Sequence, residues 1–182
     1  MKNIRLVAIY LPQFYPNLQN NKWWGMGFTE WTNVTKARPR FKGHYQPHLP
    51  SDLGFYDLRV PETRELQADL ARQYGISAFC YYHYWFNGKR ILELPIDEIL
   101  KTGKPDFPFM LCWANENWTR GWSNRFDDIL LKQDYSLEDD KSHIQYLLEI
   151  FKDPRYLRID NKPVFAIYRS TLIPNIEKTI DL

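Results

Sequence analysis

The segment ISAFCYYHYW, residues 76–85, is almost continuously apolar and aromatic, and it decides the fold class. Such a segment suits a strand that is covered on both faces, as in a parallel sheet. Similar segments occupy residues 5–11 and 163–169, and a fourth, at residues 107–114, has a proline near its start. The sequence therefore predicts four buried strands.

Helical patterns lie between these strands. Residues 61–74 carry apolar side chains at helical spacing, with a proline in the first turn and a glycine after the end. Ser136 begins a capping-box pattern, and an apolar stripe continues from it to Phe151. A shorter helix is expected at residues 94–101. Because strands and helices alternate, the sequence predicts right-handed βαβ units and a parallel α/β fold.

Two parallel architectures fit this order. A closed eight-stranded barrel needs about 250 residues, so these 182 residues would form about half of one. An open doubly wound sheet fits the length better, but the glycine-rich first turn of nucleotide-binding folds is absent. Gly25 and Gly27 lie well beyond the first strand, and Glu30 replaces the third glycine. No repeat or linker divides the chain, so we expect residues 1–182 to form a single domain.

Composition and charge narrow the class of protein. A formal net charge of +2 argues against a dominant interaction with nucleic acid or an anionic membrane. Cys80 and Cys112 lie in apolar segments, which is typical of buried thiols in a reducing compartment. The N-terminal residues lack a signal-peptide pattern, and the longest apolar segment is too short to cross a bilayer. We therefore expect a soluble cytoplasmic protein without an integral membrane segment.

The connection at residues 12–60 is far longer than most loops of compact domains. Its many tryptophan, tyrosine and phenylalanine residues argue against disorder. We expect this connection to be ordered, packed and functional.

The tryptophans all lie at or after the C-terminal ends of predicted strands, the edge where parallel α/β folds bind ligands. Flat aromatic rings suit a pyranose, whose C–H face packs on them while amides and carboxylates bind its hydroxyl groups. The alternative is that several of these rings only fill the mouth of a barrel. The set consists of Trp23, Trp24, Trp31, Trp85, Trp113, Trp118 and Trp122.

Two glutamates stand among these rings. Glu116 follows a mostly apolar strand and lies between two asparagines, and Glu30 lies in GFTEWTN, residues 27–33. Glycosyl transfer commonly uses a pair of carboxyl groups, so Glu116 is the candidate acid or base and Glu30 the candidate second carboxylate. The alternatives are that Glu116 pairs with Arg120 in a loop, and that Glu30 caps a helix or pairs with an arginine.

Three histidines have both a functional and a structural interpretation. His44 and His48 have the i, i+4 spacing of a metal-binding pair, but the neighbouring glycine and proline argue against the helix that this pair needs. We therefore expect no metal site. His83 shares a strand face with Trp85, so it would lie near the ligand if that face points into a barrel. A buried structural histidine fits the same pattern.

Four cations lie within seven residues, at Lys36, Arg38, Arg40 and Lys42. Such a run is usually a solvated face. If it borders the aromatic pocket, it could bind a phosphate, a uronic acid or a diphosphate leaving group. The chain has no phosphate-binding loop, no nucleophile elbow and no Asp-x-Asp spacing, so no cofactor is expected.

Six ordered motifs resemble the WbsX-like family of polysaccharide-biosynthesis glycosyltransferases, which is related to glycoside hydrolase family 99. The resemblance runs from residue 4 to about residue 173. The motifs are YLPQF at residues 10–14, WWGMGFTEWTN at 23–33, GHYQPHLP at 43–50, DLGFYDLR at 52–59, YHYWFNG at 82–88 and CWANENWT at 112–119.

The resemblance implies the N-terminal portion, about four to five βα units, of a (β/α)8 TIM-type barrel with a sugar site at the C-terminal strand ends. It implies a glycoside hydrolase or glycosyltransferase of bacterial surface polysaccharide metabolism, such as lipopolysaccharide O-antigen or capsule. Family 99 hydrolases carry two glutamates after the third strand, whereas this sequence has one, Glu116, so Glu30 is the expected substitute. The expected substrate-binding residues are Tyr10, Trp24, Trp31, Asn33, His44, His48, His83, Trp85, Trp113, Asn115, Asn117, Trp118 and Arg120.

The expected partner is therefore a glycan or another sugar-containing substrate. The rival interpretations are a glycan-binding module without catalysis and a truncated, inactive fragment of such an enzyme. A single-stranded nucleic-acid binder fits stacked rings with interleaved cations, but the near-neutral net charge disfavours it. If 182 residues are the full protein, we expect its open strand edges to be completed by another chain or in a homo-oligomer.

Overall fold

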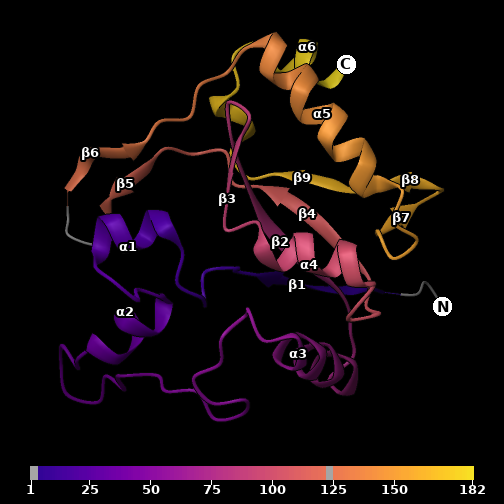
Figure 1. Cartoon of the computed structure of the whole chain (residues 1–182). Helices are drawn as coiled ribbons and strands as arrows, with labels where there is room; N and C mark the ends of the chain where they lie inside the picture. Colours follow the sequence, from indigo (N-terminus) through magenta and orange to yellow (C-terminus); the bar gives the residue numbers. More distant parts are fainter. Residues whose placement is uncertain (1–3, 122–124) are drawn as a thin grey trace.

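A computed structural model describes residues 4–121 and 125–182, and its centre is a parallel sheet. The strands are β1 (Leu6–Tyr10), β2 (Ile76–Phe86), β4 (Phe109–Trp113) and β9 (Phe165–Ile167), hydrogen-bonded in that order. Every pair along this path is parallel (Figure 1). The expected parallel α/β fold is confirmed, and strands that neighbour one another in chain order are the arrangement of a partial (β/α)8 barrel.

Three helices connect consecutive strands and cover one face of the sheet. They are α3 (Pro61–Gln73), α4 (Leu94–Thr102) and α5 (Leu137–Phe151). Arg64 of α3 lies 3.9 Å from Glu98 of α4. Arg90 binds Asp97 of α4 at 2.6 Å and Tyr146 of α5 at 2.8 Å. These contacts join the three helices into one layer.

The ends of these helices follow the sequence signals. The hydroxyl of Ser136 accepts a hydrogen bond from the backbone N–H of Asp139 at 3.1 Å, which caps α5. Helix α4 ends at Gly103, whose φ of 72° is the left-handed conformation that glycine adopts without strain. After β9 come a short 3-10 helix (Ser170–Leu172) and α6 (Ile176–Ile180).

The long connection at residues 12–60 is ordered, and it contains α1 (Leu18–Trp24) and α2 (Glu30–Lys36). Asn17 caps α1 through a 2.9 Å hydrogen bond from the backbone N–H of Asn20. Figure 1 shows both helices beside the carboxyl ends of the strands. This connection therefore lies where parallel α/β folds place their ligands.

Three antiparallel hairpins, which the sequence did not predict, extend the other connections. The first pairs β3 (Lys89–Ile91) with β2. The second joins β5 (Trp118–Arg120) to β6 (Arg125–Leu131), and the third joins β7 (Arg158–Ile159) to β8 (Lys162–Pro163).

The main core lies between the sheet and its helices, and Leu58, Ala68 and Leu111 have no exposed surface. A smaller apolar cluster of Trp85, Trp113 and Ile173 lies beside α5. Among the helices that the structure describes, none combines the length and the apolar composition that a bilayer crossing needs.

Candidate functional site

A cavity of about 200 Å³ lies at the carboxyl edge of the sheet, on the face that the helix layer leaves uncovered. Along β2 the side chains alternate between the two faces, so Tyr82 and Tyr84 point to this cavity while their neighbours point to the helices. Parallel strands end at one edge, which brings residues from three segments of the chain together. The lining residues are Tyr82, Tyr84, Ala114, Glu116, Asn117, Trp118 and Tyr168.

Glu116 lies in the cavity wall and forms an ion pair with Arg169, which follows β9. The Arg169 Nη1 donates to Glu116 Oε1 at 2.9 Å, and the two side chains are 50% and 41% exposed. The alternative that Glu116 pairs with Arg120 is wrong, because Arg120 binds Asp128 at 3.0 Å. Glu116 is thus a solvent-accessible carboxylate held against a guanidinium.

The loop that carries Glu116 is fixed by Asn115, which has no exposed surface. Its Nδ2 donates to the backbone oxygen of Arg169 at 2.9 Å, and its Oδ1 accepts from the Arg169 N–H at 2.8 Å. The hydroxyl of Tyr135 donates to the backbone oxygen of Asn115 at 2.7 Å. The structure therefore corrects the expectation that Asn115 binds substrate, because its side-chain amide joins the ends of β4 and β9 instead. Asn117, by contrast, lines the cavity.

Glu30 occupies the first turn of α2 and is held by Gln13, which follows β1. The Gln13 Nε2 donates to Glu30 Oε1 at 2.7 Å, and the Glu30 N–H donates to the backbone oxygen of Gln13 at 3.2 Å. Burial raises the pKa of the Glu30 carboxyl, and a hydrogen bond from Asn33 opposes this rise. Burial also raises the pKa of Tyr84, and the charges of Tyr82 and Glu30 raise it further. Glu30 itself is not one of the residues that line the cavity.

The tryptophans fall into separate groups. Trp118 lines the cavity, with its ring 5.3 Å from that of Tyr84 and 5.5 Å from that of Trp23. The Arg120 guanidinium lies 5.4 Å from the ring centre of Trp24, which makes a cation–π contact. Trp31 donates from Nε1 to the backbone oxygen of Tyr56 at 2.9 Å. Trp122 lies outside the described residues.

Three of the expected substrate-binding residues lie on the opposite face of the sheet from the cavity: His83, Trp85 and Trp113. The expectation that they contact the ligand is therefore corrected. Helix α5 covers them, and the ring of Trp85 stacks on His143 at 4.7 Å. The Trp113 Nε1 donates to the backbone oxygen of Trp85 at 3.3 Å, and His83 Nε2 lies 2.9 Å from His143 Nε2. The structural interpretation of His83 fits this placement.

Three other expected substrate-binding residues lie away from the cavity wall. Tyr10 is buried against α3, where its hydroxyl donates to Gln67 Oε1 at 2.6 Å. His44 stacks on Phe41 at 4.6 Å, and His48 packs edge-on against Tyr45 at 4.7 Å. The contacts of His44 and His48 lie on the loop after α2. Within residues 4–121 and 125–182, no cluster of three or more histidine, cysteine or acidic side chains is arranged to hold a metal ion.

Five residues of the candidate site are absent from the set expected from the sequence. Tyr82, Tyr84 and Tyr168 line the cavity. Arg169 binds Glu116, and Gln13 binds Glu30. Period-two alternation along β2 places the two tyrosines on one face, but it does not say which face is open. Tyr168 and Arg169 come directly after the fourth strand, so the rule that ligands bind at strand ends could have found them.

The fold and the site define a class: a partial parallel α/β barrel with carboxylates and aromatic rings at its carboxyl edge. Within this class the chain belongs to the WbsX glycosyltransferase family, whose model matches residues 6–182. The membership confirms the resemblance that the motifs indicated.

Two curated relatives match almost the whole of this chain. The uncharacterized protein WxcX from two strains of Xanthomonas campestris pv. campestris is 49% identical over 174 residues, which cover 96% of this chain and 25% of the relative. The chain therefore spans about a quarter of the length of these curated relatives.

A solved structure shares the fold. The GH99 endo-alpha-mannosidase from Bacteroides thetaiotaomicron, in complex with BIS-TRIS-propane, is similar with a TM-score of 0.52 and 18% sequence identity. The similarity covers 94% of this chain and 43% of the mannosidase chain. This likeness shows the fold and agrees with a partial barrel.

Proposed function

We propose that this chain contributes the sugar site of an enzyme that cleaves or transfers glycosidic bonds in bacterial surface polysaccharide, such as lipopolysaccharide O-antigen or capsule. The observation that carries the proposal is the cavity in which Glu116 lies among the rings of Tyr82, Tyr84, Trp118 and Tyr168. Aromatic faces pack against the C–H face of a sugar, and a carboxylate at the same place can act on its glycosidic bond. The family name and the GH99 fold support this class of chemistry.

The two carboxyl groups have environments that suit different roles. Glu116 is partly exposed and faces the Arg169 guanidinium, so it suits the base, the nucleophile or the stabiliser of an oxocarbenium-like transition state. Glu30 is half-buried, and burial raises its pKa, so it suits the acid that protonates the leaving oxygen. A pair of carboxyl groups whose surroundings differ in this way is the usual means of separating acid from base.

Substitution of Glu116 tests the proposal. The change Glu116→Gln keeps the shape of the side chain but removes its charge, so turnover should fall at least about 100-fold while glycan affinity stays nearly unchanged. Turnover is measured on a panel of O-antigen and capsular polysaccharides as release of new reducing ends or as transfer to an acceptor. Binding of the same glycans is measured by calorimetry.

The matched control is Glu177→Gln, at an exposed glutamate of α6. It removes the same charge at a residue that does not line the cavity, so both readouts should match the unsubstituted chain. If Glu116→Gln leaves turnover unchanged, Glu116 has no part in the chemistry. If the unsubstituted chain binds glycans but processes none of them, the enzymatic proposal fails and a glycan-binding module takes its place.

A further inference from the structure

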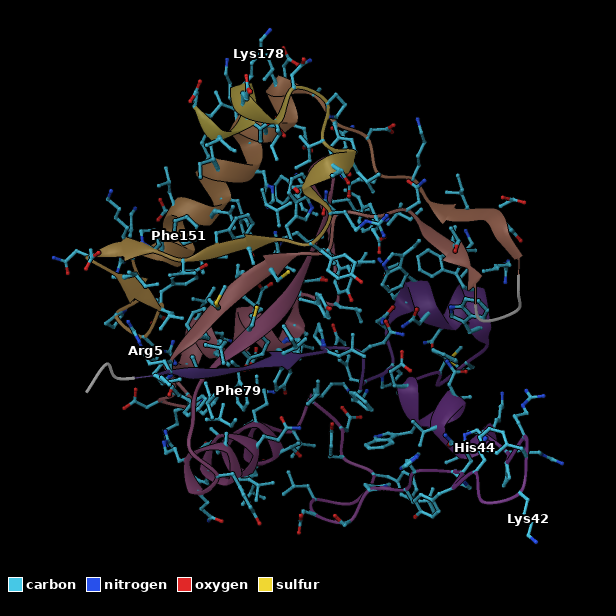
Figure 2. All side chains as sticks on the ribbon, turned by 180° about the vertical axis from the view of Figure 1, so that it is seen from behind. Arg5, Lys42, His44, Phe79, Phe151 and Lys178 are labelled. Atoms are coloured by element: carbon cyan, nitrogen blue, oxygen red, sulfur yellow. The ribbon has the colours of Figure 1, made fainter. Side chains whose placement is uncertain are left out.

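We call the cavity that contains Glu116 the sugar cavity. A second cavity, of about 450 Å³, lies on the loop after α2 and shares no residue with it. We call it the basic pocket. Figure 2 shows His44 and Lys42 of this loop at the opposite end of the molecule from Lys178. The side chains that line the basic pocket include Lys36, Arg38, Arg40, His44 and Gln46.

The cations of the basic pocket lack a counter-charge within the part of the chain that the structure describes. Among the described residues, Lys36, Arg38 and Arg40 take part in no ion pair, and no carboxylate lines the cavity. The neighbouring Lys42 is exposed, and it too forms no ion pair with a described residue. By contrast, Arg59, Arg72, Arg90 and Arg155 all pair with an aspartate within the chain. The positive charge of the basic pocket is therefore available to bind an external anion.

The other polar groups of the basic pocket also supply donors. The Nδ1 atom of His44 accepts a hydrogen bond from the backbone N–H of Arg40 at 3.2 Å, so the neutral ring carries its proton on Nε2. The Gln46 side chain adds an amide NH₂ group. A phosphate or diphosphate offers several charged acceptor oxygens, and arginine side chains bind such groups with two parallel hydrogen bonds.

We propose that the basic pocket is a binding site for a phosphate or diphosphate group. The group belongs either to a soluble compound, such as a nucleoside diphosphate, or to the phosphate head of a lipid. The site is separate from the sugar cavity, and it is tested without measuring turnover. Its failure would therefore leave the proposed glycan chemistry untouched, and the reverse also holds.

Calorimetric titration of the chain with inorganic pyrophosphate tests the site. We expect saturable binding that the double substitution Arg38→Gln/Arg40→Gln weakens at least about tenfold, because two charge-assisted hydrogen-bonding groups are lost. The matched control is Lys141→Gln/Lys178→Gln, two exposed lysines of α5 and α6. It removes the same net charge and should leave the affinity within about twofold. Circular dichroism verifies that both double variants are folded.

Two comparisons decide the chemistry and the source of the ligand. Glucuronate, with one carboxylate, should bind at least about tenfold more weakly than pyrophosphate. Co-sedimentation with phosphatidylcholine vesicles, with and without phosphatidic acid, identifies the source. Arginine-dependent vesicle binding that pyrophosphate displaces indicates a lipid phosphate, and pyrophosphate binding without vesicle binding indicates a soluble compound.

Three results would overturn the proposal. The first is an absence of saturable pyrophosphate binding by the unsubstituted chain. The second is an equal loss of affinity in both double variants, which would assign the binding to net charge alone. The third is glucuronate binding as tight as that of pyrophosphate, which would remove the preference for phosphate.

Discussion

At the scale of single residues, the candidate site depends on contacts between segments that are far apart in sequence. Glu116 and Arg169 are separated by 53 positions, yet their side chains meet at 2.9 Å because β4 and β9 are neighbours in the sheet. The position of Glu116 at a strand end predicts that it is a candidate site residue. Arg120 is the arginine closest to it along the chain, but Glu116 pairs with Arg169 instead.

Asn115 is the residue that holds this arrangement together, and its substitution should be costly. The change Asn115→Ala removes three side-chain hydrogen bonds. It takes the side-chain partner from the Arg169 N–H, while the Arg169 backbone oxygen keeps only its bond from the Leu172 N–H. We expect a loss of about 2–3 kcal/mol in the free energy of unfolding, measured by urea denaturation. The control Ser142→Ala, at an exposed position of α5, should change the free energy of unfolding by less than about 0.5 kcal/mol. An equal effect of both substitutions would refute the role given to Asn115.

At the scale of elements, strands and helices with a clear local apolar pattern could be predicted, and elements that depend on distant packing could not. The four strands and the three connecting helices have continuous or periodic apolar patterns that a sequence displays directly. The hairpin of β5 and β6 and the helices α1 and α2 are short and depend on packing against distant segments. Local propensity is too weak to define elements of this length.

The sequence also could not predict which face of β2 meets the helices. Tyr81, His83 and Trp85 alternate with Tyr82 and Tyr84, so both faces of the strand are aromatic. Alternation therefore separates two sets of side chains without showing which set meets the helices. Helix α5 decides this, because it presents His143 and Tyr146 to the first set.

The contact between β2 and α5 should make stability depend on pH. Burial, with the charges of His143 and Arg90, lowers the pKa of His83, and burial lowers the pKa of His143 to about 3. An unfolded histidine has a pKa of about 6.5, so below that pH the unfolded chain binds protons that the folded chain does not. Stability should therefore be full above pH 6.5 and fall as the pH drops from 6.5 towards 3, by up to about 2.7 kcal/mol per pH unit for two histidines.

Urea unfolding at several values between pH 5 and pH 7 measures this slope. The substitution His143→Gln leaves one buried histidine, so it should reduce the slope by about half. His48→Gln, at an exposed histidine, should leave the slope unchanged. The raised pKa of Glu30 acts in the opposite direction, but it is common to all three proteins and cancels in the comparison. An identical slope in His143→Gln and the unsubstituted chain would contradict the interpretation.

At the scale of the whole molecule, the strands of the sheet differ in how much of their surface is buried. Strand β1 pairs only with β2 among the described residues, and Ile9, its second-last residue, is 61% exposed. A cavity of about 600 Å³ with mainly apolar residues such as Leu70 and Phe79 lies between β1 and α3. An unpaired strand edge beside exposed apolar surface is a template for association with another chain.

We therefore expect the isolated 182-residue chain to self-associate through β1, with an increase in average mass as concentration rises in sedimentation equilibrium. The substitution Ile9→Lys places a charge on the exposed face of β1 and should shift the equilibrium towards the monomer by at least about tenfold, since burying a lysine at such a contact is costly. Leu148→Lys, at a half-exposed leucine of α5, adds the same charge away from β1 and should leave the equilibrium unchanged. A chain that remains monomeric at every concentration, or that associates equally well with Lys at position 9, would show that the β1 edge is protected by its own twist and short length rather than by a partner.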